Sequence, residues 1–264
     1  MGHGEYENLG VTKQADVLVI ELARPARRNA MSLELRRELT ACLLAAEADD
    51  EVRAIVITGQ GDKAFSAGAD IEELQKRTSS SELARGAELR RELPRIAETL
   101  SKPTVAAING LCLGAGLEFA VACTIRIACE SAKLGLPEIN LGVIPGSGGT
   151  QRLGRLIGLG RAMEMTVTGL PISATRAEQI GLVSEVVADD ALIERAVELA
   201  RLVGGKPQVA FVSARDAVLR SPDLDLASGL EFERRLFALC VDTEDKAEAI
   251  DAFLTKRKPT FRNR

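Results

Sequence analysis

Two stretches of buried-strand pattern in this chain are each followed by a glycine turn that opens a helix. Residues 104–108 form an apolar run with the length and β-branched content of a buried strand. The Gly-Ala-Gly segment 114–116 then opens the helical pattern of residues 117–122. Residues 54–58 form a similar run, which leads through Gly68 into another helix. Because side chains are small or absent at these turns, an electron-rich group can approach the backbone N–H groups of a first helical turn.

These two turns predict a pair of converging backbone donors. One donor is expected from the Gly68-Ala69 turn and the other from the Gly114-Ala115 turn. Such a pair is the physical requirement for an oxyanion hole, which stabilises the charge that develops on a carbonyl oxygen.

Two carboxylates in apolar surroundings follow the second turn. Glu118 lies in the first helical turn between Leu117 and Phe119, where the helix dipole favours its charged form and its neighbours favour the neutral one. Glu138 follows Pro137 in an otherwise apolar loop. Acid/base catalysis needs two titratable groups near one substrate, and this pair supplies them. The structural alternatives are compensation of the helix dipole by Glu118 and a surface turn at Glu138.

Alternating strand and helix patterns continue to about residue 188 and predict an α/β core, followed by a helical region over residues 189–264. The expected strands are 16–22, 52–58, 104–108 and 182–187. The expected helices are 33–48, a short one after Asp70, 82–100, 117–122, one from 148, 158–168, 173–181, 191–203, 207–219, 226–241 and 243–256. In the helix 33–48, Ser32 is the expected N-cap, and Arg36, Arg37 and Glu38 are expected on the solvent face.

The composition excludes several kinds of catalytic site. The 264 residues include one histidine, His3, so Ser-His-Asp, Cys-His and histidine-bearing zinc sites each lack a member. The five cysteines form no C-x-x-C pair and are expected to be reduced core residues. Carboxylates are therefore the leading acid/base candidates.

The charge and the residue types give no sign of a nucleic-acid or membrane partner. A formal net charge of −4 provides no electrostatic attraction to nucleic acid or anionic lipid, and one tyrosine with no tryptophan leaves few stacking platforms. No apolar run has the length of a membrane span, and the N-terminus lacks a signal-peptide pattern. We expect a cytoplasmic protein; a mitochondrial matrix enzyme without its transit peptide fits the same pattern.

Gly114 and Gly116 also allow a competing interpretation as a dinucleotide fingerprint, because they follow a strand and open a helix. The third glycine of that motif is missing, and Glu118 would bring negative charge toward a pyrophosphate. The chain also has no Gly-Lys-Ser/Thr phosphate loop. An oxidoreductase is therefore the weaker alternative.

Three segments together resemble the enoyl-CoA hydratase/isomerase (crotonase) superfamily. They are A-F-S-A-G-A-D at 64–70, N-G-x-x-L-G-x-G-x-E at 109–118 and P-E-I-x-L-G-x-x-P-G-x-G-G-T-Q-R-L at 137–153. The resemblance extends from about Val17 to the C-terminus. It implies a spiral of β-β-α units over residues 1–188, and a helical region over 189–264 that forms trimers and covers the coenzyme A site.

The resemblance also implies an activity and roles for particular residues. Glu118 and Glu138 fall where the hydratase branch has its catalytic pair, and Ala69 and Ala115 would donate their N–H groups to a thioester oxygen. The implied reaction is the reversible addition of water across the 2,3-double bond of an enoyl-CoA thioester, as in fatty-acid β-oxidation. No metal, flavin or nicotinamide is implied, because coenzyme A is part of the substrate. The implied assembly is a homotrimer or a hexamer built from two trimers.

Contacts to the substrate are implied at a further set of positions, which are Arg27, Arg28, Ala67, Asp70, Ile71, Gly116, Pro137 and Gly146. A solvated loop is the alternative for the two arginines, and a solvated terminus is the alternative for the basic tail 256–262, which would otherwise help to bind the nucleotide. The resemblance also implies that the region between the first turn and the central strand lines the acyl pocket, with Leu83, Leu89, Leu93 and Ile96 as the candidates; packing in the protein is the alternative for most of them.

The sequence differs from the family pattern at two positions, and the family includes reactions other than water addition. Ala115 replaces a frequent glycine, and Thr124 stands where an aspartate is usual. Isomerases of the family commonly keep one carboxylate, so the presence of both Glu118 and Glu138 favours water addition. The alternatives within the family are an enoyl-CoA isomerase and a hydratase dedicated to branched or cyclic enoyl groups.

Overall fold

The computed structural model describes residues 6–84 and 88–263. Backbone contacts divide the chain after residue 200 into two compact units. The division falls within helix α9 (Leu192–Gly204), whose Leu192, Ala196 and Ala200 are buried in the core of the first unit. The change in sequence pattern at residue 188 therefore precedes the division in space by one helix.

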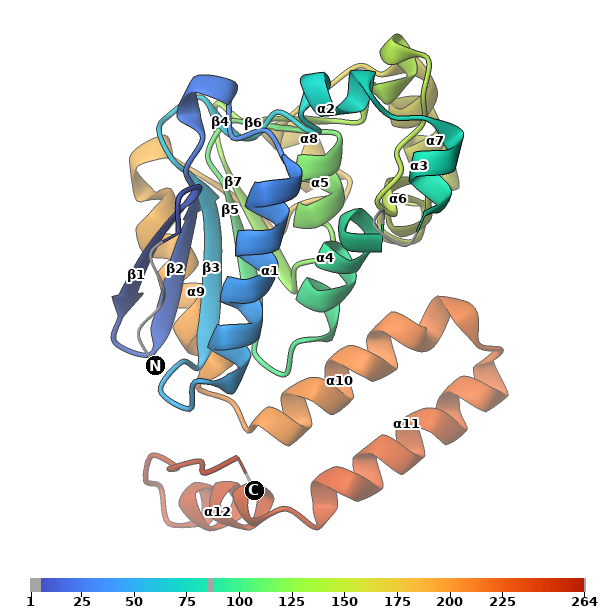
Figure 1. Cartoon of the computed structure of the whole chain (residues 1–264). Coiled ribbons are helices and arrows are strands. Elements are labelled where there is room, and N and C mark those ends of the chain that lie inside the picture. Colours follow the sequence, from blue (N-terminus) through green and yellow to red (C-terminus); the bar gives the residue numbers. More distant parts are fainter. Residues whose placement is uncertain (1–5, 85–87, 264) are drawn as a thin grey trace. The chain divides into compact units, whose positions relative to one another are not determined.

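The first unit is built on a six-stranded sheet with the strand order β1-β2-β3-β5-β7-β10 (Figure 1). All neighbouring strands run parallel except β1, which pairs with β2 in the antiparallel direction. Every residue of β3 and β5 is buried, as expected for central strands of a parallel sheet. The strands are β1 (Leu9–Gln14), β2 (Val17–Leu22), β3 (Ala54–Gly59), β5 (Thr104–Ile108), β7 (Ile125–Cys129) and β10 (Glu185–Val187).

A second, four-stranded sheet has the order β4-β6-β8-β9. Its strands are β4 (Ala64–Ser66), β6 (Leu111–Leu113), β8 (Lys133–Gly135) and β9 (Ile172–Ser173). Each of β4, β6 and β8 follows a strand of the first sheet in sequence and leads into a helix or a 3-10 turn. The chain thus repeats a strand in one sheet, a strand in the other and a helix, and this confirms the predicted succession of β-β-α units.

Helices surround these sheets. They are α1 (Leu33–Ala48), α2 (Ile71–Gln75), α3 (Ser79–Leu83), α4 (Glu88–Thr99), α5 (Ala115–Ala120), α6 (Gly149–Ile157), α7 (Leu159–Thr168), α8 (Ala174–Gln179) and α9. Helix α1 has the predicted bounds, and the Ser32 hydroxyl accepts a hydrogen bond from Leu35 N. The single helix predicted over 82–100 corresponds to the end of α3 and to α4, and residues 85–87 lie outside the described residues.

One prediction for α1 was wrong: Arg36 does not face solvent and is 2% exposed. Its Nε donates to Met31 O at 3.4 Å and its Nη1 to Arg90 O at 3.3 Å. These main-chain acceptors satisfy part of the guanidinium inside the protein, while the aliphatic stem can pack like an apolar side chain.

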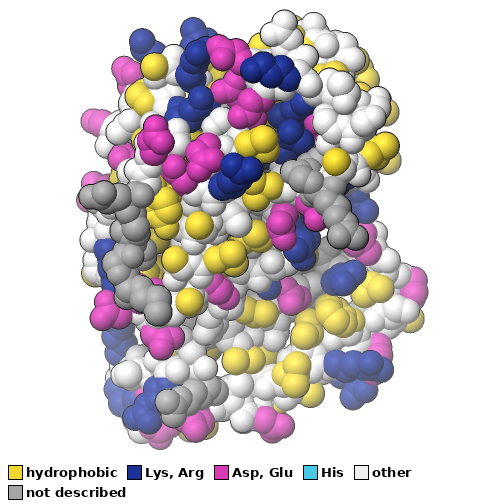
Figure 2. All heavy atoms as spheres, in the orientation of Figure 1, with side chains coloured by type: hydrophobic (Ala, Val, Ile, Leu, Met, Phe, Trp, Pro, Cys, Tyr) yellow, Lys and Arg dark blue, Asp and Glu magenta, His cyan; other side chains and the backbone are white. Residues whose placement is uncertain are grey.

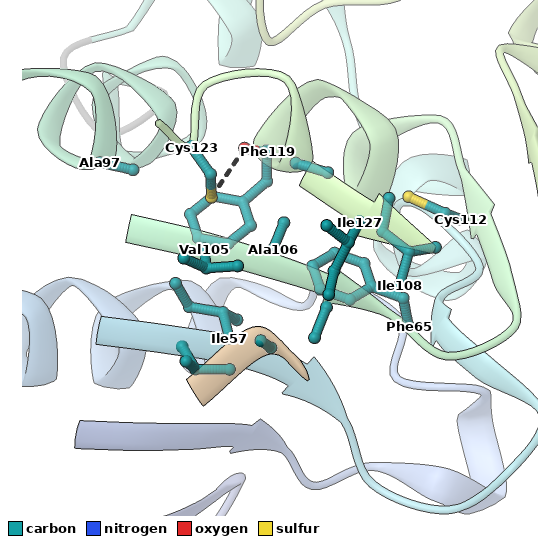
Figure 3. Close-up of a cluster of buried hydrophobic side chains, with 14 of the residues drawn as sticks. Ile57, Phe65, Ala97, Val105, Ala106, Ile108, Cys112, Phe119, Cys123 and Ile127 are labelled. Atoms are coloured by element: carbon teal, nitrogen blue, oxygen red, sulfur yellow. Dashed lines mark hydrogen bonds between the residues drawn. The ribbon is translucent and has the colours of Figure 1, made fainter. Parts of the chain in front are cut away.

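The hydrophobic core lies where α5 packs on the main sheet (Figure 3). Phe119 on α5 is 1% exposed, and Phe65 on β4 is fully buried. Cys42, Cys112, Cys123 and Cys129 are free, buried thiols, as the composition indicated, and burial raises the pKa of Cys123 to about 12. The expectation was wrong for Cys240, which is only partly buried because it lies in the second unit, on a helix with no buried residue. The core therefore fixes α5, the helix that carries Glu118, against the sheet.

Among the described residues, the second unit contains the α-helices α10 (Gln208–Arg220), α11 (Leu226–Val241) and α12 (Glu244–Leu254). The basic tail after α12 is held by acidic side chains. Arg257 pairs with Glu248 and Asp251, each at 2.6 Å, and buried Asp245 accepts hydrogen bonds from the backbone of residues 262 and 263. None of the helices in the described ranges is both long and apolar enough to span a membrane.

Candidate active site

Glu118 lies in the first turn of α5 and is 2% exposed. Its Oε1 accepts two backbone hydrogen bonds, from Ser147 N at 2.7 Å and from Gly149 N at 2.8 Å. A Cβ at position 149 would lie 3.1 Å from Oε1 and 3.0 Å from Cγ of Glu118, so this close approach favours glycine. The glycine-rich turn before α6 therefore fixes one carboxylate oxygen and leaves Oε2 for other partners.

Glu138 lies in the 3-10 helix Pro137–Leu141, and its carboxylate reaches back over the start of α5. A Cβ on Gly114, whose φ is +49°, would lie 2.8 Å from Glu138 Oε1. The other oxygen, Oε2, is buried and has no hydrogen-bond partner within the described chain. A buried polar atom without a partner is rare in folded proteins and is often found at functional sites.

The two carboxylates affect each other electrostatically. Burial, and to a smaller extent the nearby charge of Glu118, raise the pKa of Glu138 to about 7. A carboxylic acid with a pKa near neutrality can both donate and accept a proton under ordinary conditions. Glu138 therefore has the protonation behaviour of a general acid/base group.

The predicted pair of backbone donors comes together through the second sheet, where β4 pairs with β6. A Cβ on Gly68, whose φ is +106°, would lie 3.1 Å from Leu113 O and 3.7 Å from Ala115 N, so the two turns are direct neighbours. Within the described part of the chain, no hydrogen bond has the N–H of Ala69 or Ala115 as its donor. Ala115 is the first residue of α5, where a free N–H group is expected.

The remaining predicted contact residues lie around these turns in different ways. Asp70 caps α2 by accepting from Glu72 N, and its other oxygen bonds Arg24 at 3.0 Å. Ala67 N donates to Arg28 O, and Ile71 is 58% exposed. Both oxygens of the Asp70 side chain are therefore engaged in hydrogen bonds within the protein, whereas the exposed Ile71 side chain is available to a ligand.

Three of the predicted contact residues, Gly116, Pro137 and Gly146, have different surroundings. A Cβ on Gly116 would lie 2.7 Å from Ser66, so this residue lets α5 pack closely on β4. Pro137 begins the 3-10 helix that carries Glu138. Gly146 is exposed, and a Cβ there would meet nothing within 4 Å.

The two arginines expected at coenzyme A are both exposed. Arg27 pairs with Glu72 at 2.8 Å on the surface. Arg28 has a left-handed backbone conformation, with φ of 49°. Among the residues expected at the acyl pocket, Leu93 is fully buried in the core, while Leu83 is 84% exposed. Leu89 and Ile96 are partly buried.

The structure also shows residues whose role the sequence did not indicate. Ser147 and Gly149 hold Glu118 through their N–H groups. The signal that could have indicated this contact is the glycine run around them, since glycines allow a close approach to the backbone. Arg36 is three and seven residues from buried Leu39 and Leu43, a spacing that places it on the buried face of α1. Thr124, which stands where the family usually has an aspartate, pairs with Thr104. Thr104 N donates to the Thr124 hydroxyl at 3.2 Å, and Thr124 N donates to the Thr104 hydroxyl at 2.9 Å.

Comparisons with known proteins agree with this fold. The family model described as enoyl-CoA hydratase/isomerase matches residues 12–264. A probable enoyl-CoA hydratase from Rhizobium meliloti is 46% identical over 98% of this chain and 99% of its own length. A 2,3-dehydroadipyl-CoA hydratase from Escherichia coli is 41% identical over 96% of this chain and 97% of its own. A solved enoyl-CoA hydratase from Bacillus anthracis has a TM-score of 0.92 and 39% identity, covering 98% of this chain and all of that one.

Buried Glu118 and half-buried Glu138 lie beside two main-chain N–H groups that donate no hydrogen bond within the described residues, and this arrangement is suited to acid/base chemistry on a carbonyl compound. The chain belongs to the enoyl-CoA hydratase/isomerase family, and its full-length similarity to proteins named enoyl-CoA hydratases supports a hydro-lyase of that type.

Proposed function

We propose that this protein adds water reversibly across the 2,3-double bond of an enoyl-CoA thioester to give a 3-hydroxyacyl-CoA. The observation that carries the proposal is the position of Glu138, whose pKa is raised to about 7 and whose carboxylate lies against Gly114, next to the unused N–H of Ala115. A thioester oxygen bound at that N–H would bring the carbons next to it within reach of the two glutamates. Water addition needs this set of groups on one substrate.

The chemistry can be written with every proton accounted for. The N–H groups of Ala69 and Ala115 bind the thioester oxygen and draw electron density from the double bond, so the β-carbon becomes electrophilic. Glu118, as the carboxylate, takes a proton from water while the water oxygen bonds to the β-carbon. Glu138, as the acid, delivers a proton to the α-carbon. One C–O and one C–H bond form, while the π bond and one O–H bond of the water break. Glu118 then carries the proton from water and Glu138 has lost its own, and proton exchange with solvent returns Glu118 to the carboxylate and Glu138 to the acid.

The reaction as proposed needs no cofactor beyond the coenzyme A of the substrate. Addition of water leaves the overall oxidation state unchanged, so no electron acceptor takes part. The negative charge that develops is taken up by the thioester carbonyl, which the two backbone donors stabilise.

A hydration assay tests the proposal directly. Purified protein with a panel of linear, branched and cyclic 2-enoyl-CoA thioesters should lower the enoyl absorbance, and addition of nicotinamide should not change the rate. An isomerase would instead convert 3-enoyl-CoA into 2-enoyl-CoA faster than it hydrates the product. Absence of hydration with every thioester of the panel would reject the proposal.

The pH profile provides a second test. Hydration starts with Glu118 as carboxylate and Glu138 as acid, and dehydration starts with the proton on Glu118 instead, so both directions need the pair to hold one proton. Because the reaction consumes no net proton, kcat/KM must have the same pH dependence in both directions. We expect kcat/KM to fall above about pH 7 as the pair loses its proton, in line with the raised pKa of Glu138. A kcat/KM that stays constant as the pH rises through 7 would contradict this assignment.

The exposed apolar side chains of the second unit support an oligomer. No residue of α11 is buried, and Leu226, Leu230 and Phe237 are 79%, 55% and 69% exposed at spacings that place them on one side of the helix. Figure 2 shows hydrophobic side chains among charged ones over α10 and α11. Stripes of this kind typically pack against another protein surface. We expect light scattering to give a mass of three or six chains, and a monomer would count against this proposal.

A further inference from the structure

Three arginine side chains form a cluster that the proposed reaction does not use. They are Arg36 on α1, Arg77 just after α2, and Arg90 on α4, and we call them the arginine cluster. Arg36 is 2% exposed, and the side chains of Arg77 and Arg90 are 16% and 12% exposed. The charges of Arg77 and Arg90 each act on Arg36, so the three guanidinium groups lie near one another.

Among the described residues, Glu82 forms ion pairs with this cluster but makes no hydrogen bond to it. Glu82 Oε1 lies 3.2 Å from Arg90 Nη1 and 3.6 Å from Arg77 Nε, and the Glu82 side chain is 44% exposed. Neither approach has the geometry of a hydrogen bond. Arg77 Nε and Nη2 and Arg90 Nε and Nη1 are all buried without a hydrogen-bond partner within the described chain.

Other acidic groups near the cluster are already engaged. Glu73 acts on Arg36 and Arg77 through its charge, but both of its oxygens accept from Leu33 N, at 3.0 and 3.2 Å. Burial lowers the pKa of Arg36 to about 10. Burial and the charge of Arg90 lower the pKa of Arg77. Buried like charges with unpaired donors are unfavourable unless an anion joins them.

The cluster adjoins the candidate active site. The charge of Glu118 acts on Arg36, and α4 packs against both α1 and α5. The Gly68-Ala69 turn, which provides one of the two backbone donors, leads into α2, and Arg77 follows the end of that helix. The other donor lies at the start of α5. An acyl group held by its thioester oxygen at Ala69 and Ala115 extends from the carbons beside Glu118, and its far end is the part of the substrate that can come to the arginine cluster.

We propose that the arginine cluster binds a carboxylate at the far end of the acyl group, so that the preferred substrates are enoyl-CoA thioesters whose acyl chain carries a terminal carboxylate. Guanidinium groups match the planar geometry of a carboxylate and can bind it through paired hydrogen bonds. This inference rests on the proposed function, because it concerns the substrate of the same site.

The first test compares matched substrates with the unmodified protein. Linear 2-enoyl-CoA thioesters of increasing length are used in pairs, one ending in a methyl group and the other in a carboxylate. At the length that fits, kcat/KM should be at least about tenfold higher for the carboxylate member, the effect of one or two charge-assisted hydrogen bonds. A preference for the methyl member at every length would overturn the inference and leave the proposed function intact. Hydration of neither member would reject the proposed function itself.

Substitutions then assign the preference to the cluster. In Arg77→Gln, and independently in Arg90→Gln, the ratio of kcat/KM between the two members should fall by about tenfold to a hundredfold. Arg91→Gln removes the same charge from an exposed position on α4 and should leave the ratio unchanged. If the arginines instead served the phosphates of coenzyme A, both members would weaken equally and the ratio would not move, which would also overturn the inference.

A substitution that should raise the ratio of kcat/KM between the two members, rather than lower it, tests whether the arginine cluster binds the substrate carboxylate or has only a structural role. Glu82 lies 3.6 Å from Arg77 and 3.2 Å from Arg90, so its charge would compete with a substrate carboxylate for these two arginines. Glu82→Gln removes this competing charge and should raise the ratio in favour of the carboxylate member by several-fold. If Glu82 were only the structural counter-ion of the cluster, its removal would lower thermal stability and leave the ratio unchanged, and that outcome would contradict the inference.

Discussion

Glu118→Gln should lower kcat for hydration by about 10²–10⁴, the range typical of a lost general acid/base group. Gln has the shape of Glu, and its carbonyl oxygen can still accept from Ser147 N and Gly149 N at the start of α6. The fold and the turn therefore remain, while the group that takes the proton from water is gone. KM should change little, because the N–H groups of Ala69 and Ala115 still bind the thioester. Steady-state hydration kinetics on one linear enoyl-CoA measure both constants.

A control separates the loss of the base from the loss of a negative charge. Glu130 is exposed at the end of β7, so Glu130→Gln removes the same charge without touching the site and should keep full activity. Melting temperatures and circular dichroism of both variants report on folding. Full activity of Glu118→Gln would remove this carboxylate from the mechanism.

The elements that the sequence predicted well are those whose signals are local. Helix α1 was placed correctly because Ser32 is a hydroxyl cap and a long apolar periodicity follows it. Strands β3 and β5 were found from continuous apolar runs bounded by turns. The family, fold and enzyme class were predicted from three motifs, and the comparisons confirm them.

The second sheet was not predicted, because its strands have two or three residues and too few positions to show a period. They exist through pairing with partners far along the chain, such as Ala64 with Leu111 and Leu111 with Lys133. Edge strand β1 was also missed, since most of its residues are not fully buried and its pattern includes Lys13 and Gln14. Long-range pairing of this kind leaves little trace in a local pattern.

For the site, the sequence indicated the titratable groups and the turns but not the contacts between them. That Glu118 is held by the turn before α6, and that Glu138 lies over Gly114, depends on the second sheet bringing β6 beside β8. The arginine cluster depends on Arg36 being inside the protein. An isolated helix pattern treats arginine as a solvent residue, whereas main-chain acceptors and neighbouring helices make its burial possible. The catalytic roles themselves stay predictions.

Glu138→Gln should also lower kcat for hydration by about 10²–10⁴, and it should remove the fall in kcat/KM above about pH 7 that we assign to the proton shared by the pair. The amide cannot deliver a proton to the α-carbon, although it can still bind beside the substrate. Exchange of the α-proton of a 3-hydroxyacyl-CoA with deuterated water should slow by a similar factor, because that step uses the same group. An unchanged alkaline limb in this variant would show that another residue carries the proton.

The contact between Glu138 and Gly114 gives an independent way to move the same carboxylate without removing it. In Gly114→Ala the new Cβ would lie 2.8 Å from Glu138 Oε1, so the carboxylate must shift, and a residue with φ of +49° is strained as well. Gly181→Ala is the matched control, because φ is +77° there and a Cβ would meet nothing within 4 Å. Both variants should lose some stability from the backbone strain, but only Gly114→Ala should lose kcat, by at least about tenfold if a displaced acid behaves like a partly lost one. Equal kcat in the two variants would mean that proton delivery at the α-carbon does not depend on where the Glu138 carboxylate lies.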